Sequence, residues 1–338
     1  MALRLRPGAA AQHRPGDGRG GGGGGQRRGG AHGGGGRRGR AVSPWPPAPL
    51  RNHGAQPTGG TLGVTRPGHQ PQPAERPRVV PTFSVCIVVR DRAVLLVNAI
   101  RSVLANDFPD FEVVVVDDGS QVPVTRVLHE AMLSADGRVR VFTQPPSGIA
   151  QARNVALRMS TGRYVTVLDS DDELSTDALG RLHHLLTTTG AHWIYTDYRE
   201  VSRDRARSIQ LPDYRTPGRM LLGVLTRPRL PFKHSGTTID RRVLDRIGGY
   251  DESFRLFEDI ELVLRALRAG VHPRRLAHPV VLFRRHDGNV TRGRMSGLVF
   301  WFRLVDMYRP CRVPGAGLGI KALRALSEAG KWLVTLGR

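Results

Sequence analysis

The chain has 338 residues and a formal net charge of +22, so it is long enough for one large α/β domain with extensions or for two small domains. Half of the positive excess lies in residues 1–80, which hold 13 Arg, no Lys and 2 acidic residues, a net charge of +11. Half of the basic character therefore belongs to one segment, and the net charge by itself does not mark the rest of the chain as a nucleic-acid-binding domain.

Residues 1–80 are rich in Gly, Arg and Pro, with glycine runs at 20–25 and 33–36. Such a composition buries too little apolar surface to offset the entropy of ordering, so we expect a disordered tail. Arg-Gly segments also act as arms that follow nucleic-acid phosphates. Aromatic residues that would stack on bases are not interleaved with these arginines, which favours a solvated tail, and we do not expect a nucleic-acid partner.

The cysteine count and the hydropathy pattern indicate a compartment. Cys86 and Cys311 are the two cysteines, too few for a disulfide framework, so we expect a reducing, cytoplasmic environment. No run approaches the ~20 apolar residues of a membrane span, and the N-terminus lacks the apolar core of a signal peptide. Residues 318–336 predict an amphipathic helix, which packs on its own domain or makes peripheral membrane contact.

Apolar strand-like runs alternate with helical patterns from residue 83 onward. Apolar runs too short for helices predict strands at 84–89, 111–116, 139–142, 164–168 and 191–196. Helical spacing predicts helices at 95–104 and 148–159, and a third between a Ser175 cap and Gly190. This alternation predicts an α/β fold in which a mostly parallel sheet carries helices on both faces.

The pattern is less regular after Tyr198. Residues 199–235 are rich in Arg, Pro and turn formers, and they predict loops with one short helix near 220–225. A clearer amphipathic helix follows and ends at Gly270. A short apolar run at 280–283 predicts one more strand.

Two acidic clusters follow predicted strands directly. Residues 117–120 read Asp-Asp-Gly-Ser, and residues 169–172 read Asp-Ser-Asp-Asp. Ligands bind beyond the carboxyl ends of the strands in an open parallel sheet, so we expect both clusters at one edge. Clustered carboxylates repel one another, and a divalent cation that prefers oxygen ligands, Mg²⁺ or Mn²⁺, would compensate them and hold a diphosphate. For either cluster alone the alternative is a strand-to-helix turn with an Asp cap, and for Asp-Asp-Gly-Ser alone that alternative is equally favoured.

Over about residues 83–290 the sequence resembles the family 2 glycosyltransferases of the GT-A fold. The resemblance is carried, in order, by FSVCIVVRDRA, DFPDFEVVVVDDGS, SGIAQARNVALRMSTGRYVTVLDSDDEL and GGYDESFRLFEDIELVLRAL. It implies a Rossmann-like nucleotide-diphospho-sugar transferase fold. It also implies inverting transfer of a sugar from a nucleoside-diphosphate donor, usually a UDP-sugar, to an acceptor hydroxyl that the sequence does not identify.

The resemblance also implies which residues bind the nucleotide-sugar. Asp118, with Asp117, is implied to bind the nucleobase; Asp169 lies nearer the ribose, and Asp171 binds the metal. The full set of implied nucleotide-sugar positions is Asp91, Asp117, Asp118, Gly148, Arg153, Asp169, Ser170, Asp171 and Glu258. The sequence departs from the family pattern where the first strand ends, because Arg90 stands at the aromatic position and Asp91 at the Asn position. The nucleobase therefore stays open.

An inverting transferase needs a carboxylate to take the proton of the attacking hydroxyl. The pair Glu258-Asp259 resembles the family's E-D pair, in which the Asp serves as the base, so Asp259 is the candidate catalytic residue. Acidic residues also favour helix N-termini for dipole reasons alone. His286, after Arg284-Arg285, is a candidate third metal ligand with Asp169 and Asp171, and a surface loop is the alternative there.

These expectations divide the chain into four parts: a tail at 1–80, a nucleotide-sugar-binding half at 81–198, an acceptor-binding half at 199–295, and a helical extension at 296–338. The sequence also allows two rival functions. A sugar-nucleotide pyrophosphorylase would carry a Gly-rich loop after its first strand, and residues 90–93 contain no glycine. A nucleic-acid-binding protein with an inactive transferase-like domain would act through the Arg-Gly tail.

Overall fold

A computed structural model describes residues 80–202, 205–226, 231–284, 294–309 and 315–336. The chain divides into two units, Met1–Ser43 and Pro44–Arg338, and all described residues belong to the second unit. The tail predicted at residues 1–80 therefore lies, apart from its last residue, outside the described residues.

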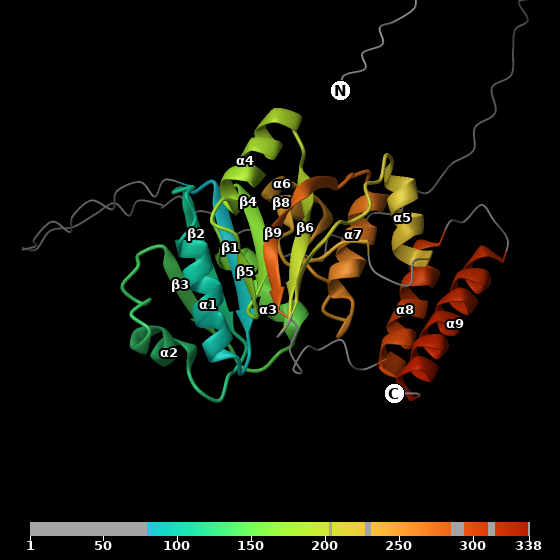
Figure 1. The fold of residues 1–338 in the computed structure, drawn as a ribbon, viewed down its shortest axis with the longest axis horizontal. Helices are drawn as coiled ribbons and strands as arrows, with labels where there is room; N and C mark the ends of the chain where they lie inside the picture. The colour runs from blue at the N-terminus through green and yellow to red at the C-terminus, as the bar shows by residue number, and fades with distance from the viewer. Residues whose placement is uncertain (1–79, 203–204, 227–230, 285–293, 310–314, 337–338) are drawn as a thin grey trace, which may run out of the picture. The chain divides into compact units, whose positions relative to one another are not determined.

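The first half of the sheet is parallel and regular (Figure 1). Its strands are β1 (Phe83–Val89), β2 (Phe111–Asp117), β3 (Val139–Thr143) and β4 (Tyr164–Asp169), in the spatial order β3-β2-β1-β4. They are connected by helices α1 (Ala93–Leu104), α2 (Val124–Glu130) and α3 (Ile149–Met159). Every residue of β2 is buried, because a strand covered on both faces has no solvent side.

The second half continues the same sheet with strands of both directions. The order beyond β4 is β8 (Thr238–Asp240), β6 (Trp193–Val201), β9 (Arg274–Arg284) and β5 (Asp172–Leu174), while β7 (Ala206–Ile209) pairs with β6. β8 is antiparallel to both β4 and β6, β6 is parallel to β9, and β5 is antiparallel to β9. The predicted α/β fold with a mostly parallel sheet is confirmed, and three of the described strands, β5, β7 and β8, run against the majority.

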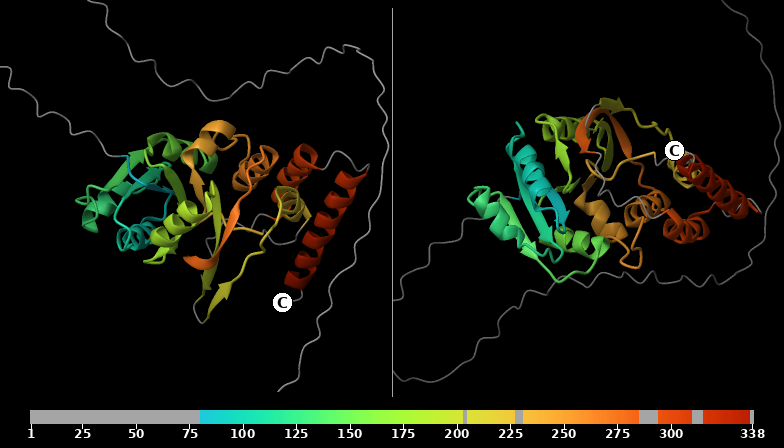
Figure 2. Two further views of the ribbon diagram at one scale, coloured as in Figure 1. Left: turned by 90° about the horizontal axis from the view of Figure 1, so that it is seen from above. Right: turned by 60° about the horizontal axis from the view of Figure 1, so that its bottom comes forward.

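Helices cover both faces of the sheet (Figures 1 and 2). Val113 and Val115 of β2 join a core that includes α1, α2 and α4 (Ala178–Thr189). Val114 and Val116 join a second core that includes α3, α6 (Arg241–Ile247), α7 (Glu258–Arg268) and α8 (Arg294–Tyr308). The two-residue alternation of strand side chains thus separates the two cores.

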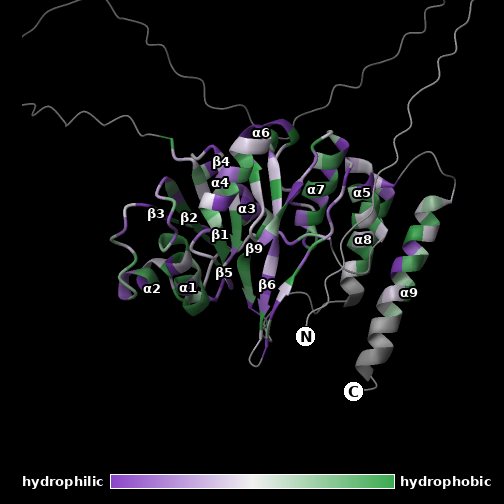
Figure 3. Cartoon of the chain, turned by 45° about the horizontal axis from the view of Figure 1, so that its top comes forward, coloured by the Kyte–Doolittle hydropathy of each residue, from purple (hydrophilic) through white to green (hydrophobic). Residues whose placement is uncertain are grey.

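Two further helices complete the described part. α5 (Pro217–Thr226) contacts α7, and α9 (Ala316–Leu336) contacts α5 and α8. Figure 3 shows hydrophobic and hydrophilic residues side by side along the described part of α9. Among the described helices, none is both long enough and apolar enough to cross a membrane.

The structure differs from the predicted elements in several places. In the segment 199–235, predicted as loops with one short helix near 220–225, the helix is confirmed as α5, but the segment also contains the end of β6 and all of β7. β9 has 11 residues rather than the short run predicted at 280–283. β7 is mostly exposed and β9 begins with Arg274-Arg275, so β7 and the start of β9 lack the continuous apolar run that marks a buried strand.

Candidate active site

Both acidic clusters lie at the carboxyl edge of the parallel strands. β1 lies between β2 and β4, and its register places Val89 opposite Asp117 and Val88 opposite Asp169. Each cluster therefore begins beside the end of β1, as the strand-end argument predicted. β8 and β6 continue the sheet on the β4 side, so the loops before β8 and after β4 face the same edge.

The carboxylates of the first cluster organise the surrounding loops. Asp117 is 1% exposed, and it accepts hydrogen bonds from the amides of Ser120 (2.9 Å) and Val124 (3.3 Å). Asp118 accepts from Ser147 N (2.8 Å) and Gly148 N (3.0 Å), and from the Gln144 side chain (2.7 Å). Asp117 thus holds its own turn, and Asp118 joins that turn to the loop before α3.

Asp91 anchors the loop after β1 to the same turn. Its φ of +55° lies in the left-handed region, which Asp tolerates better than most residues other than Gly. Its amide donates to Ser120 Oγ (3.0 Å), and its Oδ1 accepts from Gln121 N (2.8 Å). Arg90, at the family's aromatic position, is about half exposed and lies 3.8 Å from Asp91.

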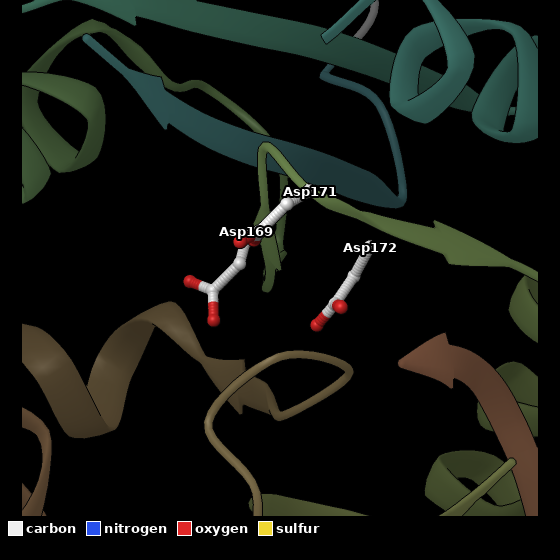
Figure 4. Close-up of side chains that lie close together, drawn as sticks. All are labelled: Asp169, Asp171 and Asp172. Atoms are coloured by element: carbon white, nitrogen blue, oxygen red, sulfur yellow. The ribbon is translucent and has the colours of Figure 1, made fainter. Parts of the chain in front are cut away.

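The second cluster brings three carboxyl groups together after β4 (Figure 4). Ligand oxygens of Asp169, Asp171 and Asp172 all lie within 4.8 Å of one another. Asp169 pairs with Arg153 (3.0 Å), and Asp171 pairs with Arg92 (2.8 Å). Asp172 is 1% exposed, and neither of its oxygens has a hydrogen-bond partner among the described residues.

This arrangement fits a divalent cation. A buried carboxylate without hydrogen bonds is costly, and burial beside Asp169 raises the pKa of Asp172 to about 8. Hard oxygen ligands from several carboxylates are what Mg²⁺ and Mn²⁺ prefer. Ser170, between Asp169 and Asp171, is also buried. The orphaned oxygens of Asp172 therefore make the cluster chemically suited to a metal.

Arg153 connects the second cluster to the Glu258-Asp259 pair, which contains the predicted general base. Its Nη2 donates to Asp169 Oδ1 (3.0 Å), and its Nη1 donates to Glu258 Oε1, while the guanidinium lies over the Tyr250 ring at 5.5 Å. Arg153 is 7% exposed, and the carboxylates hold its pKa above the usual value despite its burial. Gly148 is the N-cap of α3, the helix that carries Arg153, and its φ of +97° is a conformation that favours glycine.

Glu258 and Asp259 form the first turn of α7. Phe257 precedes them with a φ of +66°, unusual for an aromatic residue, and its ring packs on Trp301 of α8 at 5.6 Å. Burial raises the pKa of Glu258 to about 7. Burial also raises the pKa of Asp259, and Arg153 offsets this only in part. Asp259 Oδ1 accepts from the next amide, Ile260 N, at 2.8 Å.

Three side chains near the site had no role in the sequence interpretation. Asp172 belongs to the quoted acidic run but was given no role, although a third acid beside a D-x-D pair was a usable signal. Arg92 pairs with Asp171. Its place directly after Arg90 and Asp91, where the sequence departs from the family pattern, was the available signal. Lys233 carries no motif; its ammonium lies 2.9 Å from the centroid of the Phe283 ring, and burial lowers its pKa.

Two histidines also bear on the predicted site. His286 lies outside the described residues, so its assignment as a metal ligand stays a prediction. His234 is buried, and its Nε2 lies 2.7 Å from the hydroxyl of Tyr250, the ring under Arg153. His234 thus contacts Arg153 indirectly, through Tyr250.

The fold and the acidic edge together define the GT-A nucleotide-diphospho-sugar transferase class. S. aureus TarS 1–349 in complex with UDP-GlcNAc is similar, with a TM-score of 0.57 and 17% identity over 73% of this chain and 72% of that one. The mannosyltransferase PcManGT from Pyrobaculum calidifontis, in complex with GDP-Man and Mn²⁺, has a TM-score of 0.51 and 20% identity over 74% and 70% of the two chains.

Residues 84–249 match the glycosyl transferase family 2 model, so this segment is a glycosyl transferase family 2 domain. The succinoglycan biosynthesis protein ExoO of Rhizobium meliloti (strain 1021) is 32% identical over 201 residues, 56% of this chain and 57% of that protein. Chondroitin synthase of Escherichia coli is 33% identical over 126 residues, 37% of this chain and 18% of that protein. The chain thus spans less than two thirds of the length of these curated relatives.

Proposed function

We propose that the chain transfers a sugar from a nucleoside-diphosphate sugar, a UDP-sugar in the first instance, to an acceptor hydroxyl with inversion. One observation carries this proposal: the Arg153 guanidinium contacts Asp169 at the end of β4 and Glu258 at the start of α7. The D-x-D cluster and the E-D pair, remote in sequence, therefore share one site. Donor binding and proton removal from an acceptor are the two tasks such a site can combine.

The donor's nucleoside is assigned to the loops after β1 and β2. Asp118 faces the loop before α3, and Gly148 and Arg153 border that loop. Asp91 holds the β1 loop against the β2 turn. The similar structures bind UDP-GlcNAc and GDP-Man, so both nucleobases have precedents in this fold.

Asp171 and Asp169, with Asp172 beside them, are assigned to a divalent cation, Mn²⁺ or Mg²⁺. When bound, such a cation holds the diphosphate and neutralises charge on the leaving group. The supporting observations are the clustered ligand oxygens, the orphaned oxygens of Asp172 and the Mn²⁺ in the similar mannosyltransferase structure. His286 is a further proposed ligand.

Asp259 is assigned the role of general base. A base works best when its pKa approaches the working pH, and burial shifts the pKa of Asp259 upward. Glu258 shares Arg153 with Asp169, so it holds the first turn of α7 against the donor-binding elements. Asp259 then accepts the proton as the acceptor oxygen attacks the anomeric carbon.

Residues 199–256 are assigned to the acceptor. The chain is placed in the cytoplasm with peripheral membrane contact as an option. The exposed apolar side chains of α9, which include Leu318 (75% exposed), Leu323 (52%) and Leu326 (71%), support that option.

A donor screen tests the proposed function. Nucleoside diphosphate released from a panel of UDP- and GDP-sugars is measured with and without Mn²⁺. We expect metal-dependent release from at least one donor, and Asp171→Ala to abolish the metal-dependent part because it removes a ligand. Turnover by Asp171→Ala that still depended on Mn²⁺ would refute the metal assignment, and no release from any donor would refute the proposed function.

A further inference from the structure

We propose that Arg92 is an exchangeable counter-ion, which pairs with Asp171 in the metal-free site and moves to the donor diphosphate when a divalent cation takes that carboxylate. This inference rests on the proposed function and adds a residue that the sequence motifs do not assign. It makes Arg92 both a competitor of the metal and a ligand of the donor.

The ion pair itself is the first step of the argument. Arg92 Nη1 lies 2.8 Å from Asp171 Oδ2, and the two side chains are 26% and 9% exposed. A charge-assisted hydrogen bond of this length, partly shielded from water, is stronger than an exposed pair. A cation that binds the same carboxylate oxygen meets like-charge repulsion from the guanidinium, so metal binding and this ion pair oppose each other.

The loop of Arg92 holds it at this point. Asp91, immediately before it, adopts the left-handed conformation and is tied to the β2 turn through Ser120 and Gln121. The strand before this loop lies between β2 and β4, so the loop emerges between the two acidic clusters. The backbone next to Arg92 is therefore held in place by Asp91, and the long Arg92 side chain reaches the second cluster.

The contacts and exposure of Arg153 and Arg92 indicate which of the two arginines changes its partner. Arg153 pairs with Asp169 and also with Glu258, and it is buried, so it is a fixed cation. Arg92, which pairs with Asp171, has the more exposed side chain of the two arginines, 26% against 8%. A diphosphate held near Asp171 brings phosphate oxygens beside Arg92, and a guanidinium binds phosphate through paired hydrogen bonds. The negative donor thus replaces the carboxylate as the partner of Arg92.

The test compares two binding measurements on Arg92→Met, with Arg92→Lys as the charge-retaining variant and Arg101→Met, exposed on α1, as the matched control. Mn²⁺ binding without nucleotide is measured by electron paramagnetic resonance, and UDP and GDP binding at saturating Mn²⁺ by calorimetry. For Arg92→Met we expect Mn²⁺ to bind about tenfold more tightly, and the nucleoside diphosphate about tenfold more weakly, each the size of one charge-assisted hydrogen bond.

Arg92→Met is expected to bind Mn²⁺ more tightly and the nucleoside diphosphate more weakly. A damaged fold would weaken both, so it does not imitate this result. Arg92→Lys is expected to keep Mn²⁺ affinity near that of the wild type, because its charge remains, and Arg101→Met to change neither affinity. Unchanged or weaker Mn²⁺ binding by Arg92→Met would overturn the exchange, as would unchanged nucleoside diphosphate binding. A wild-type chain that bound neither UDP nor GDP would overturn the proposed function and the donor half of this inference, while the Mn²⁺ arm would still decide the pairing with Asp171.

Discussion

Arg153 is the side chain on which the candidate site depends most. One buried guanidinium holds Asp169 from the sheet edge and Glu258 from α7, and it lies over the ring of Tyr250. The sequence predicted that Arg153 borders the nucleotide, because its motif lies next to Gly148. It could not predict the bond to Glu258, which lies 105 residues later and is set only by packing.

Removing this arginine leaves a buried acid without its partner. We expect Arg153→Met to destabilise the fold by about 3–5 kcal/mol, the range for breaking a buried ion pair from one side. The double variant Arg153→Met/Glu258→Gln removes both charges, so it should recover part of that loss. Chemical unfolding of the three proteins measures the difference. A single variant as stable as the wild type would show that the pair contributes nothing to folding.

Asp172 and Lys233 are two further residues whose surroundings could not be predicted from the sequence. The acidic run at 169–172 was visible in the sequence, but the burial of Asp172 was not, nor was the contact of the loop before β8 with the cluster, where Ser235 Oγ accepts from Asp169 N. Lys233 in that loop lies over Phe283 of β9. Neighbours that come from different strands of the same sheet edge have no local signature in one sequence.

At the scale of elements, strong local periodicity decided what could be predicted. β1, β2, β4, α1 and α3 were predicted because their apolar runs are continuous or helically spaced. β5 and β8 have three residues each, and their strand conformation depends on partners from distant segments. The helix predicted to begin at a Ser175 cap begins at Ala178, with Asp177 in the cap position and Ser175 donating to it.

α6 offers a test of one element through its cap. Asp240 accepts from Arg242 N (3.0 Å) and pairs with the Arg242 side chain. Burial alone would raise the pKa of Asp240, but the hydrogen bonds from Arg242 lower it to about 2. The pKa in the unfolded chain is about 3.9, so the charge stabilises the fold above about pH 4, and this contribution is lost as the pH falls toward the folded pKa.

Asp240→Asn keeps an oxygen for the cap and removes the charge. We expect the wild type to have a higher free energy of unfolding than this variant at pH 5, and the gap to shrink at pH 3. Urea unfolding at the two pH values measures it, with Asp245→Asn, an exposed acid of the same helix, as the control. A gap that was the same at pH 5 and pH 3 would contradict the ionic origin of the stabilisation.

At the scale of the whole molecule, the described sheet brings distant sequence segments to one edge. The order β2-β1-β4 puts both acidic clusters beside β1, and α7 approaches them through Arg153. The fold class was predictable because strands and helices alternate, and alternation permits few topologies. The division into halves at residue 198 stays a proposal about roles; in the described structure residue 198 lies within β6, which belongs to the common sheet.

The central claim is that donor binding and proton transfer are separate tasks of one site. Asp259→Asn tests it most directly, measured by donor binding and by nucleoside diphosphate release with the donor found in the screen, and compared with Asp245→Asn. We expect donor affinity to stay within about twofold of the wild type, while release falls by about 10²–10⁴-fold, the usual contribution of a general base. Full activity of Asp259→Asn, or loss of donor binding in parallel with activity, would contradict the account.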